Sequence, residues 1–144
     1  MKILLRFASN KNFASAVVRR FTRSEFSHID YIFADGRAYS SLPRAGVGFN
    51  TDANDREEYF EIEVKDKKKI EDFLLYYHGA KYDWSAIFGF TFRSEYNDTA
   101  AWFCSELITA AIEQDTVLFN EPNKYRITPR DMYINPLLKR VSNI

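Results

Sequence analysis

The sequence predicts an α+β domain in which an antiparallel sheet packs against helices. Three observations carry this prediction: short apolar stretches that alternate with polar residues, separate stretches with apolar residues at helical spacing, and compact turn signals between them. The 144-residue chain has no internal repeat, low-complexity run or linker, so we expect one domain over residues 1–144. Hydrophobic residues at 46% favour a compact globular protein over a disordered one.

The N-terminal third predicts a strand, a helix and a hairpin. Residues 2–7 fit a first strand, and Ser9 and Asn10 supply an N-cap for a helix over residues 11–21. Residues 26–33 form the best strand pattern in the chain, because aromatic and β-branched residues dominate it. The Asp35-Gly36 pair is a strong hairpin signal, and residues 37–42 would form the returning strand.

The rest of the chain predicts one further strand and two or three helices. Pro43, Gly46 and Gly48 favour an irregular passage over residues 43–48. A strand over residues 59–64 and a helix that ends near Gly79 follow, with His78 in the last turn as a structural residue. The next elements would be a short aromatic helix over residues 83–90, a loop, a helix from Cys104 to about residue 114, and a tail of turns and extended pieces.

Charge and composition exclude several classes of function. Twenty basic and twenty acidic residues cancel, so no global field attracts nucleic acid or an anionic membrane. A single cysteine excludes an internal disulfide. Arg6 interrupts the N-terminal apolar run, and no stretch has the length of a membrane span. We therefore expect a soluble protein without a signal peptide that is made in the cytoplasm, with export by another route left open.

Cys104 is the first candidate for chemistry because it stands where a helix should begin. A helix N-terminus favours the thiolate form of a cysteine, which is the nucleophilic form. The structural alternative is that Cys104 shares an apolar helix face with Leu107, Ile108 and Ala111 and belongs to the core.

His28 is the candidate base for such a nucleophile. Strand alternation directs His28 and Asp30 to the same face, so Asp30 could orient the imidazole. The alternative for His28 is a satisfied core histidine. The two histidines and one cysteine lack the spacing of a zinc site, and no cofactor is expected.

Four pieces of the sequence, taken in order, resemble a known family. They are Phe26-Ser27-His28 before Asp35-Gly36, then Gly46-Val47, then Lys81-Tyr82-Asp83, then the run from Trp102 to Ile108. Together with a Thr128-Pro129-Arg130-Asp131 turn, they resemble the circularly permuted, NlpC-like branch of the papain-fold cysteine hydrolases. That branch includes relatives of lecithin retinol acyltransferase.

The resemblance implies a papain-like fold with Cys104 as the nucleophile and His28 as the base. It implies a polar third residue at Ser40, where related sequences often have glutamate. Asp30 stands where relatives often have glycine, and whether Ser40 or Asp30 orients His28, or neither, stays open. The strand-one Gly-Asp pair of the family is absent, with Met1-Lys2-Ile3 in its place.

The reaction implied is hydrolysis of an amide or isopeptide bond through a Cys-His thioester mechanism. The family's substrates are peptides of cell-wall fragments or acyl chains on lipids, and the setting is a bacterial or phage protein. Two alternatives remain, an acyltransferase or lipid thioesterase on the same site and a catalytically weak binding or structural module. The sequence indicates neither the substrate nor the oligomeric state.

Overall fold

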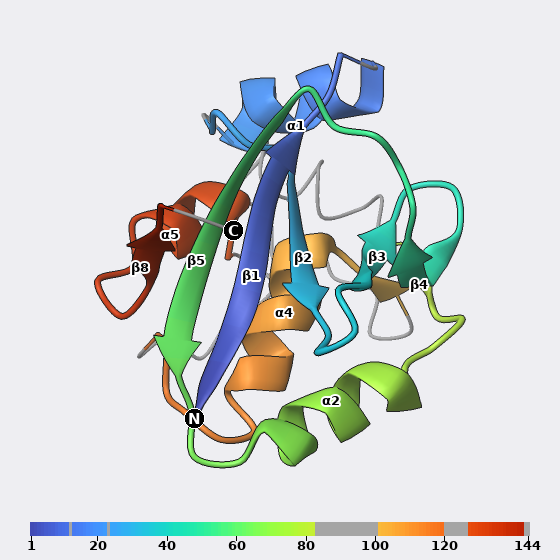
Figure 1. Cartoon of the computed structure of the whole chain (residues 1–144). Coiled ribbons are helices and arrows are strands. Elements are labelled where there is room, and N and C mark those ends of the chain that lie inside the picture. The colour runs from blue at the N-terminus through green and yellow to red at the C-terminus, as the bar shows by residue number, and fades with distance from the viewer. Residues whose placement is uncertain (12, 23, 83–100, 120–126, 143–144) are drawn as a thin grey trace.

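The protein is an α+β structure built on one curved antiparallel sheet. A computed structural model describes residues 1–11, 13–22, 24–82, 101–119 and 127–142 (Figure 1). Six strands pair in the order β4-β3-β2-β1-β5-β8, and each pairing is antiparallel. The strands are β1 (Lys2–Ser9), β2 (His28–Ile32), β3 (Ala38–Leu42), β4 (Gly46–Asn50), β5 (Arg56–Glu63) and β8 (Lys139–Val141).

Strand β1 lies inside the sheet, where it pairs with β2 on one side and β5 on the other, and its side chains alternate between two environments. Ile3, Leu5 and Phe7 are at most 2% exposed and belong to the main hydrophobic core. Arg6 lies on the opposite face of the strand, where the register places it across from Asp30 of β2. This face carries the polar network of the site described below.

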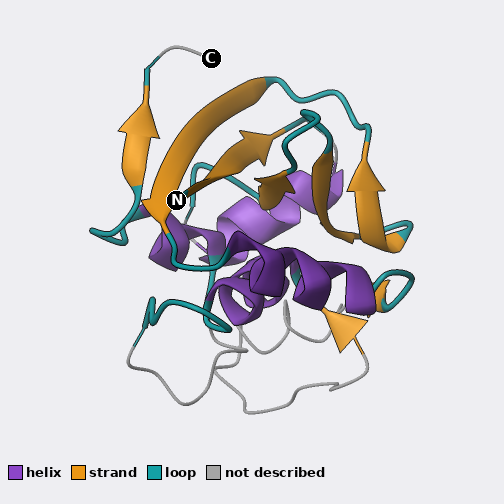
Figure 2. Cartoon of the chain, turned by 60° about the horizontal axis from the view of Figure 1, so that its bottom comes forward, coloured by secondary structure: helices purple, strands orange, loops and turns teal. Residues whose placement is uncertain are grey.

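The helices are α1 (Phe13–Thr22), α2 (Lys67–Tyr76), α4 (Cys104–Ile112) and α5 (Pro129–Tyr133). Figure 2 shows helices packed along one side of the curved sheet. Leu107, Ile108 and Ile112 of α4 are buried in the same core as Leu5 and Phe7. The apolar face predicted for the cysteine helix is therefore present.

Strands β2 and β3 pair over a short distance only. The register joins Tyr31 with Tyr39 and Ile32 with Ala38. A second sheet joins β6 (Lys81–Tyr82) to β7 (Ala101–Trp102) in parallel, immediately before α4. The Ser41 hydroxyl of β3 donates to the Trp102 carbonyl at 2.5 Å, so the chain leading into α4 is tied to β3.

The structure differs from the sequence prediction in the β6–β7 sheet, which was not predicted, and at two further places. Residues 43–48, expected to be irregular, form a turn and then the start of β4. Gly46 makes this possible, since its φ is +73° and a Cβ there would lie 2.1 Å from the Ala80 oxygen. The tail contains α5 and β8 as well as turns, because Thr128 and Asp131 form a capping box that begins α5.

The helix expected over residues 83–90 lies outside the described residues. Within the described part of the chain, no helix is long and apolar enough to cross a membrane.

Candidate active site

Cys104 is the first residue of α4. The residue before it, Phe103, has extended backbone, and its carbonyl accepts the first helical hydrogen bond from Leu107 at 3.0 Å. The Glu106 carboxylate turns back and accepts the Phe103 N–H at 3.1 Å, which fixes where the helix begins. The thiol therefore stands at the positive end of the helix dipole.

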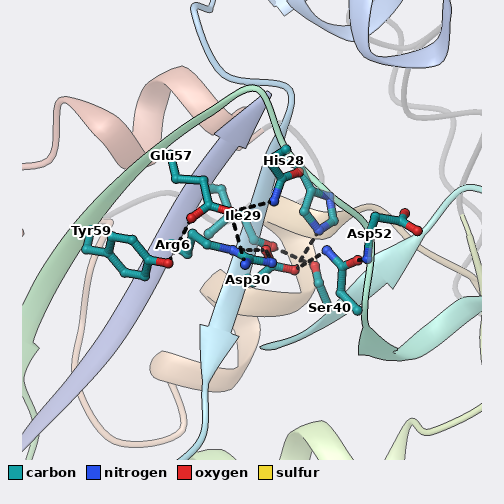
Figure 3. Close-up of polar contacts among 10 residues, drawn as sticks. Arg6, His28, Ile29, Asp30, Ser40, Asp52, Glu57 and Tyr59 are labelled. Atoms are coloured by element: carbon teal, nitrogen blue, oxygen red, sulfur yellow. Dashed lines mark hydrogen bonds and ion pairs between the residues drawn. The ribbon is translucent and has the colours of Figure 1, made fainter. Parts of the chain in front are cut away.

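His28 and Asp30 meet on the polar face of β2, as strand alternation predicts. His28 Nε2 lies 2.8 Å from Asp30 Oδ1 (Figure 3). The Asp30 side chain is 0% exposed and that of His28 is 14% exposed. The Cys104 thiol donates to the carbonyl of Ser27, the residue before His28, at 3.9 Å. Cys104 lies close enough to help raise the pKa of His28, so the thiol, the imidazole and the carboxylate are neighbours.

The groups around His28 keep its imidazole protonated at neutral pH. Burial by itself opposes a charged ring, but the attraction and hydrogen bond to Asp30, with a further contribution from Cys104, raise the pKa of His28 to about 10. Burial likewise opposes the Asp30 carboxylate, yet His28, Arg6 and Asn50 together hold the pKa of Asp30 below its usual value. The pair is thus an imidazolium next to a carboxylate.

The thiol is covered by a small apolar cluster outside the main core. Cys104 is 1% exposed and packs with Val18 of α1, Tyr82 of β6 and Phe103. The Ser15 and Ser27 hydroxyls, 2.5 Å apart, join α1 to the residue before His28. Helix α1 therefore lies over the Cys104 thiol.

Ser40, the third residue that the family resemblance implies, uses its hydroxyl elsewhere. Ser40 Oγ donates to the Ile29 carbonyl at 2.6 Å, and both groups are buried. Of the two candidates for orienting His28, Asp30 is the one in contact with it. His78 pairs its Nδ1 with the Tyr39 hydroxyl at 3.0 Å, in agreement with a structural role.

Sequence reasoning did not find Arg6 and Asn50, which both hold Asp30. Arg6 Nε lies 2.9 Å from Asp30 Oδ2, and Asn50 Nδ2 lies 2.9 Å from Asp30 Oδ1. No local sequence pattern marks either residue as a partner of Asp30. They lie 24 and 20 positions from it in the sequence, and the order of the strands in the sheet brings them together. A buried acid on a strand could have prompted a search for a basic partner.

Comparison with known proteins supports the fold and leaves the chemistry open. No protein-family model matches the sequence, and no curated protein does. Among solved structures, the chain is similar to the crystal structure of metalloprotein yiiX from Escherichia coli O157:H7, DUF1105. The superposition has a TM-score of 0.69 at 14% identity and covers 100% of this chain and 97% of the other. A likeness at this identity shows the fold alone.

The arrangement can perform nucleophilic chemistry. A thiol at a helix N-terminus, an imidazole near it and a carboxylate that orients the imidazole are the parts from which an activated cysteine is built. Among the residues that the structure describes, no group of three or more His, Cys, Asp or Glu side chains is placed to hold a metal ion.

Proposed function

We propose that the protein is a cysteine-dependent hydrolase that cleaves an amide or isopeptide bond, with Cys104 as nucleophile and His28 as acid and base. The observation that carries the proposal is the buried Asp30 carboxylate 2.8 Å from His28 Nε2, beside the Cys104 thiol, which donates to the carbonyl of the residue before His28. A core histidine needs no buried carboxylate partner, whereas a catalytic one needs a group that fixes its orientation.

In the first half of the reaction, Cys104 Sγ attacks the carbonyl carbon of the substrate as a thiolate paired with imidazolium. The carbon–nitrogen bond breaks, the acyl group remains on sulfur as a thioester, and His28 gives its proton to the leaving amine. Nε2 is occupied by Asp30, which leaves Nδ1 as the nitrogen that exchanges the proton. Backbone N–H groups in the first turn of α4 would bind the oxyanion.

In the second half, the neutral imidazole removes a proton from water, and the resulting hydroxide attacks the thioester. The carbon–sulfur bond breaks, the acid product leaves, and the thiolate and imidazolium return. Asp30 stabilises the imidazolium in both halves without taking up the proton itself.

The fold proposed for this function is the circularly permuted papain-like one. Its support is the order of the chain, with His28 on a strand that precedes the cysteine helix, and the sequence resemblance over the same residues. The same resemblance supports two substrate classes, peptides of cell-wall fragments and acyl chains on lipids. The Escherichia coli protein of similar fold is described as a metalloprotein. The tests below therefore include a chelator, because thiol and imidazole also bind zinc.

Trapping of the thioester tests the proposal. The protein is incubated with p-nitrophenyl acetate, with cell-wall stem peptides and with phospholipid vesicles, and is then examined by mass spectrometry for an acyl adduct on Cys104. We expect an adduct that is absent from Cys104→Ala and that disappears in water. Transfer to an added amine or alcohol in preference to water would instead show an acyltransferase. If no acyl donor modifies Cys104 under any of these conditions, the hydrolase proposal is wrong.

A further inference from the structure

The two oxygens of the Asp30 carboxylate are held by different partners. Oδ1 accepts from His28 Nε2 at 2.8 Å and from Asn50 Nδ2 at 2.9 Å. Oδ2 faces the Arg6 guanidinium, whose Nε lies at 2.9 Å and Nη2 at 2.8 Å. These partners come from β2, β4 and β1, so the carboxylate is fixed from three strands (Figure 3).

The ion pair between Arg6 and Asp30 is largely shielded from solvent. The side chain of Asp30 is 0% exposed, that of Arg6 is 13% exposed, and Asn50 is 8% exposed. Arg6 and Asp30 are direct partners in the β1–β2 register, so the guanidinium reaches the carboxylate without crossing another strand. Solvent screens such a pair far less than an exposed one.

We propose that Arg6 is a positioning residue of the active site, which holds Asp30 Oδ2 so that Oδ1 faces His28 and whose charge limits how strongly the carboxylate retains the imidazole proton. This inference rests on the proposed function. A proton held too tightly by the His28–Asp30 pair could not pass to the leaving amine. By sharing the carboxylate, Arg6 keeps the imidazolium a usable acid.

In the part of the chain that the structure describes, the ionisable groups around the pair are as follows, together with Asp52, whose backbone N–H donates to Asn50 Oδ1. His28 faces Asp30 on β2 and Cys104 on α4. Arg6 faces Asp30 and, on β5, Glu57 and Tyr59. The neighbouring charges are bound elsewhere: Glu106 of α4 accepts from the Phe103 N–H, and Arg19 of α1 donates to the carbonyls of Asn10 and Ser15. Among the described residues, Arg6 is thus the cation that pairs with Asp30 beside His28.

The sign of the effect follows from electrostatics. Arg6 is a positive charge beside the carboxylate that binds the imidazolium, so removing it strengthens the hold of Asp30 on the His28 proton. Two cations on opposite oxygens of one carboxylate are on the order of 6 Å apart, which at an effective dielectric constant of about 20–40 corresponds to about one to two pKa units. Loss of Arg6 should therefore raise the pKa of His28 by about that amount.

NMR titration of the His28 ring tests the inference. The chain has two histidines, so His78→Gln assigns the His28 signals. Arg6→Gln keeps hydrogen-bond donors for Asp30 but removes the charge, while Arg6→Lys keeps the charge. We expect the ring to stay protonated to a higher pH in Arg6→Gln and to titrate close to the wild type in Arg6→Lys. Arg37→Gln, which removes an exposed arginine, should leave the titration unchanged.

An unchanged or lowered His28 pKa in folded Arg6→Gln would overturn the inference. If Arg6→Gln does not fold, Arg6→Met is titrated in its place, with the same expected direction. The titration needs no substrate, so its outcome does not depend on whether the protein is a hydrolase. A His28 pKa that ignores Arg6, with Cys104 still reactive through His28, removes only the role of Arg6. If the His28 pKa rises in Arg6→Gln but Cys104 is unreactive, the hydrolase proposal is wrong, whereas the electrostatic coupling of Arg6 to His28 stands.

Discussion

Replacing Asp30 by asparagine should destabilise the protein strongly and should do so in a pH-dependent way. Asn has nearly the same shape, so the change removes the charge with little change in packing. The variant leaves His28 without its carboxylate and leaves Arg6 with Glu57 as its acidic partner, at 3.3 Å. Breaking a buried ion pair by removing one member typically costs about 3–5 kcal/mol.

The loss of stability can also be calculated from the pKa of the His28 imidazole. The folded-state pKa of His28 is about 10 and the ordinary value is 6.5, and proton linkage between these values gives on the order of 4 kcal/mol at neutral pH. Because the folded pKa is raised, this contribution is complete below about pH 6.5 and is lost as the pH rises through about 10. The difference between wild type and Asp30→Asn should therefore shrink over that range.

The assay is guanidinium unfolding of both proteins at several pH values, with the His28 titration followed by NMR. In Asp30→Asn we expect the pKa of His28 to fall well below 10, since burial is then opposed by the contribution from Cys104 without that of the carboxylate. Asp35→Asn is the matched control. Its carboxylate pairs with Arg37 at the surface, where an ion pair is worth about 0–1 kcal/mol.

The reasoning is refuted if Asp30→Asn lowers the free energy of unfolding by less than about 1 kcal/mol, the cost expected of an exposed pair. It is equally refuted if the loss of stability is independent of pH, or if His28 still titrates near 10 without the carboxylate.

Three further predictions concern the surroundings of the site. Ser40→Ala should leave the alkylation rate of Cys104 unchanged and lower stability by about 1 kcal/mol, since only a buried hydrogen bond is lost; a large fall in rate would return Ser40 to the site. Val18→Ala should speed alkylation of Cys104, because the residue covers the thiol; an unchanged rate would mean that access lies elsewhere. Gly46→Ala should destabilise the protein by at least about 2 kcal/mol in a thermal melt, more than Gly36→Ala, because both have positive φ but only Gly46 lacks space for a Cβ; equal losses would contradict this.

Local patterns predicted the parts of the site that lie on one element. Alternation along residues 26–33 placed His28 and Asp30 on one face, and the apolar spacing after Cys104 placed the thiol at the start of a helix. Both inferences depend on the geometry of a single strand or helix, which neighbouring residues in the sequence fix.

The parts that escaped prediction depend on sheet order and close approach. Arg6 and Asn50 reach Asp30 because β1 and β4 lie where they do, and no local pattern encodes that order. Strand β4 was missed because its glycines suggested a loop, whereas Gly46 serves the close contact with the Ala80 carbonyl. The resemblance directed attention to Ser40, whose hydroxyl is taken by the Ile29 carbonyl.

The central claim is that Cys104 is an activated nucleophile coupled to His28, and the alkylation rate against pH tests it most directly. Iodoacetamide reports on Cys104 alone, because the chain has one cysteine, and a chelator in every sample excludes protection by metal. The account predicts rapid alkylation at neutral pH that slows strongly in His28→Ala but not in His78→Ala. Slow alkylation with the same pH dependence in all three proteins would contradict it and would make Cys104 a core residue.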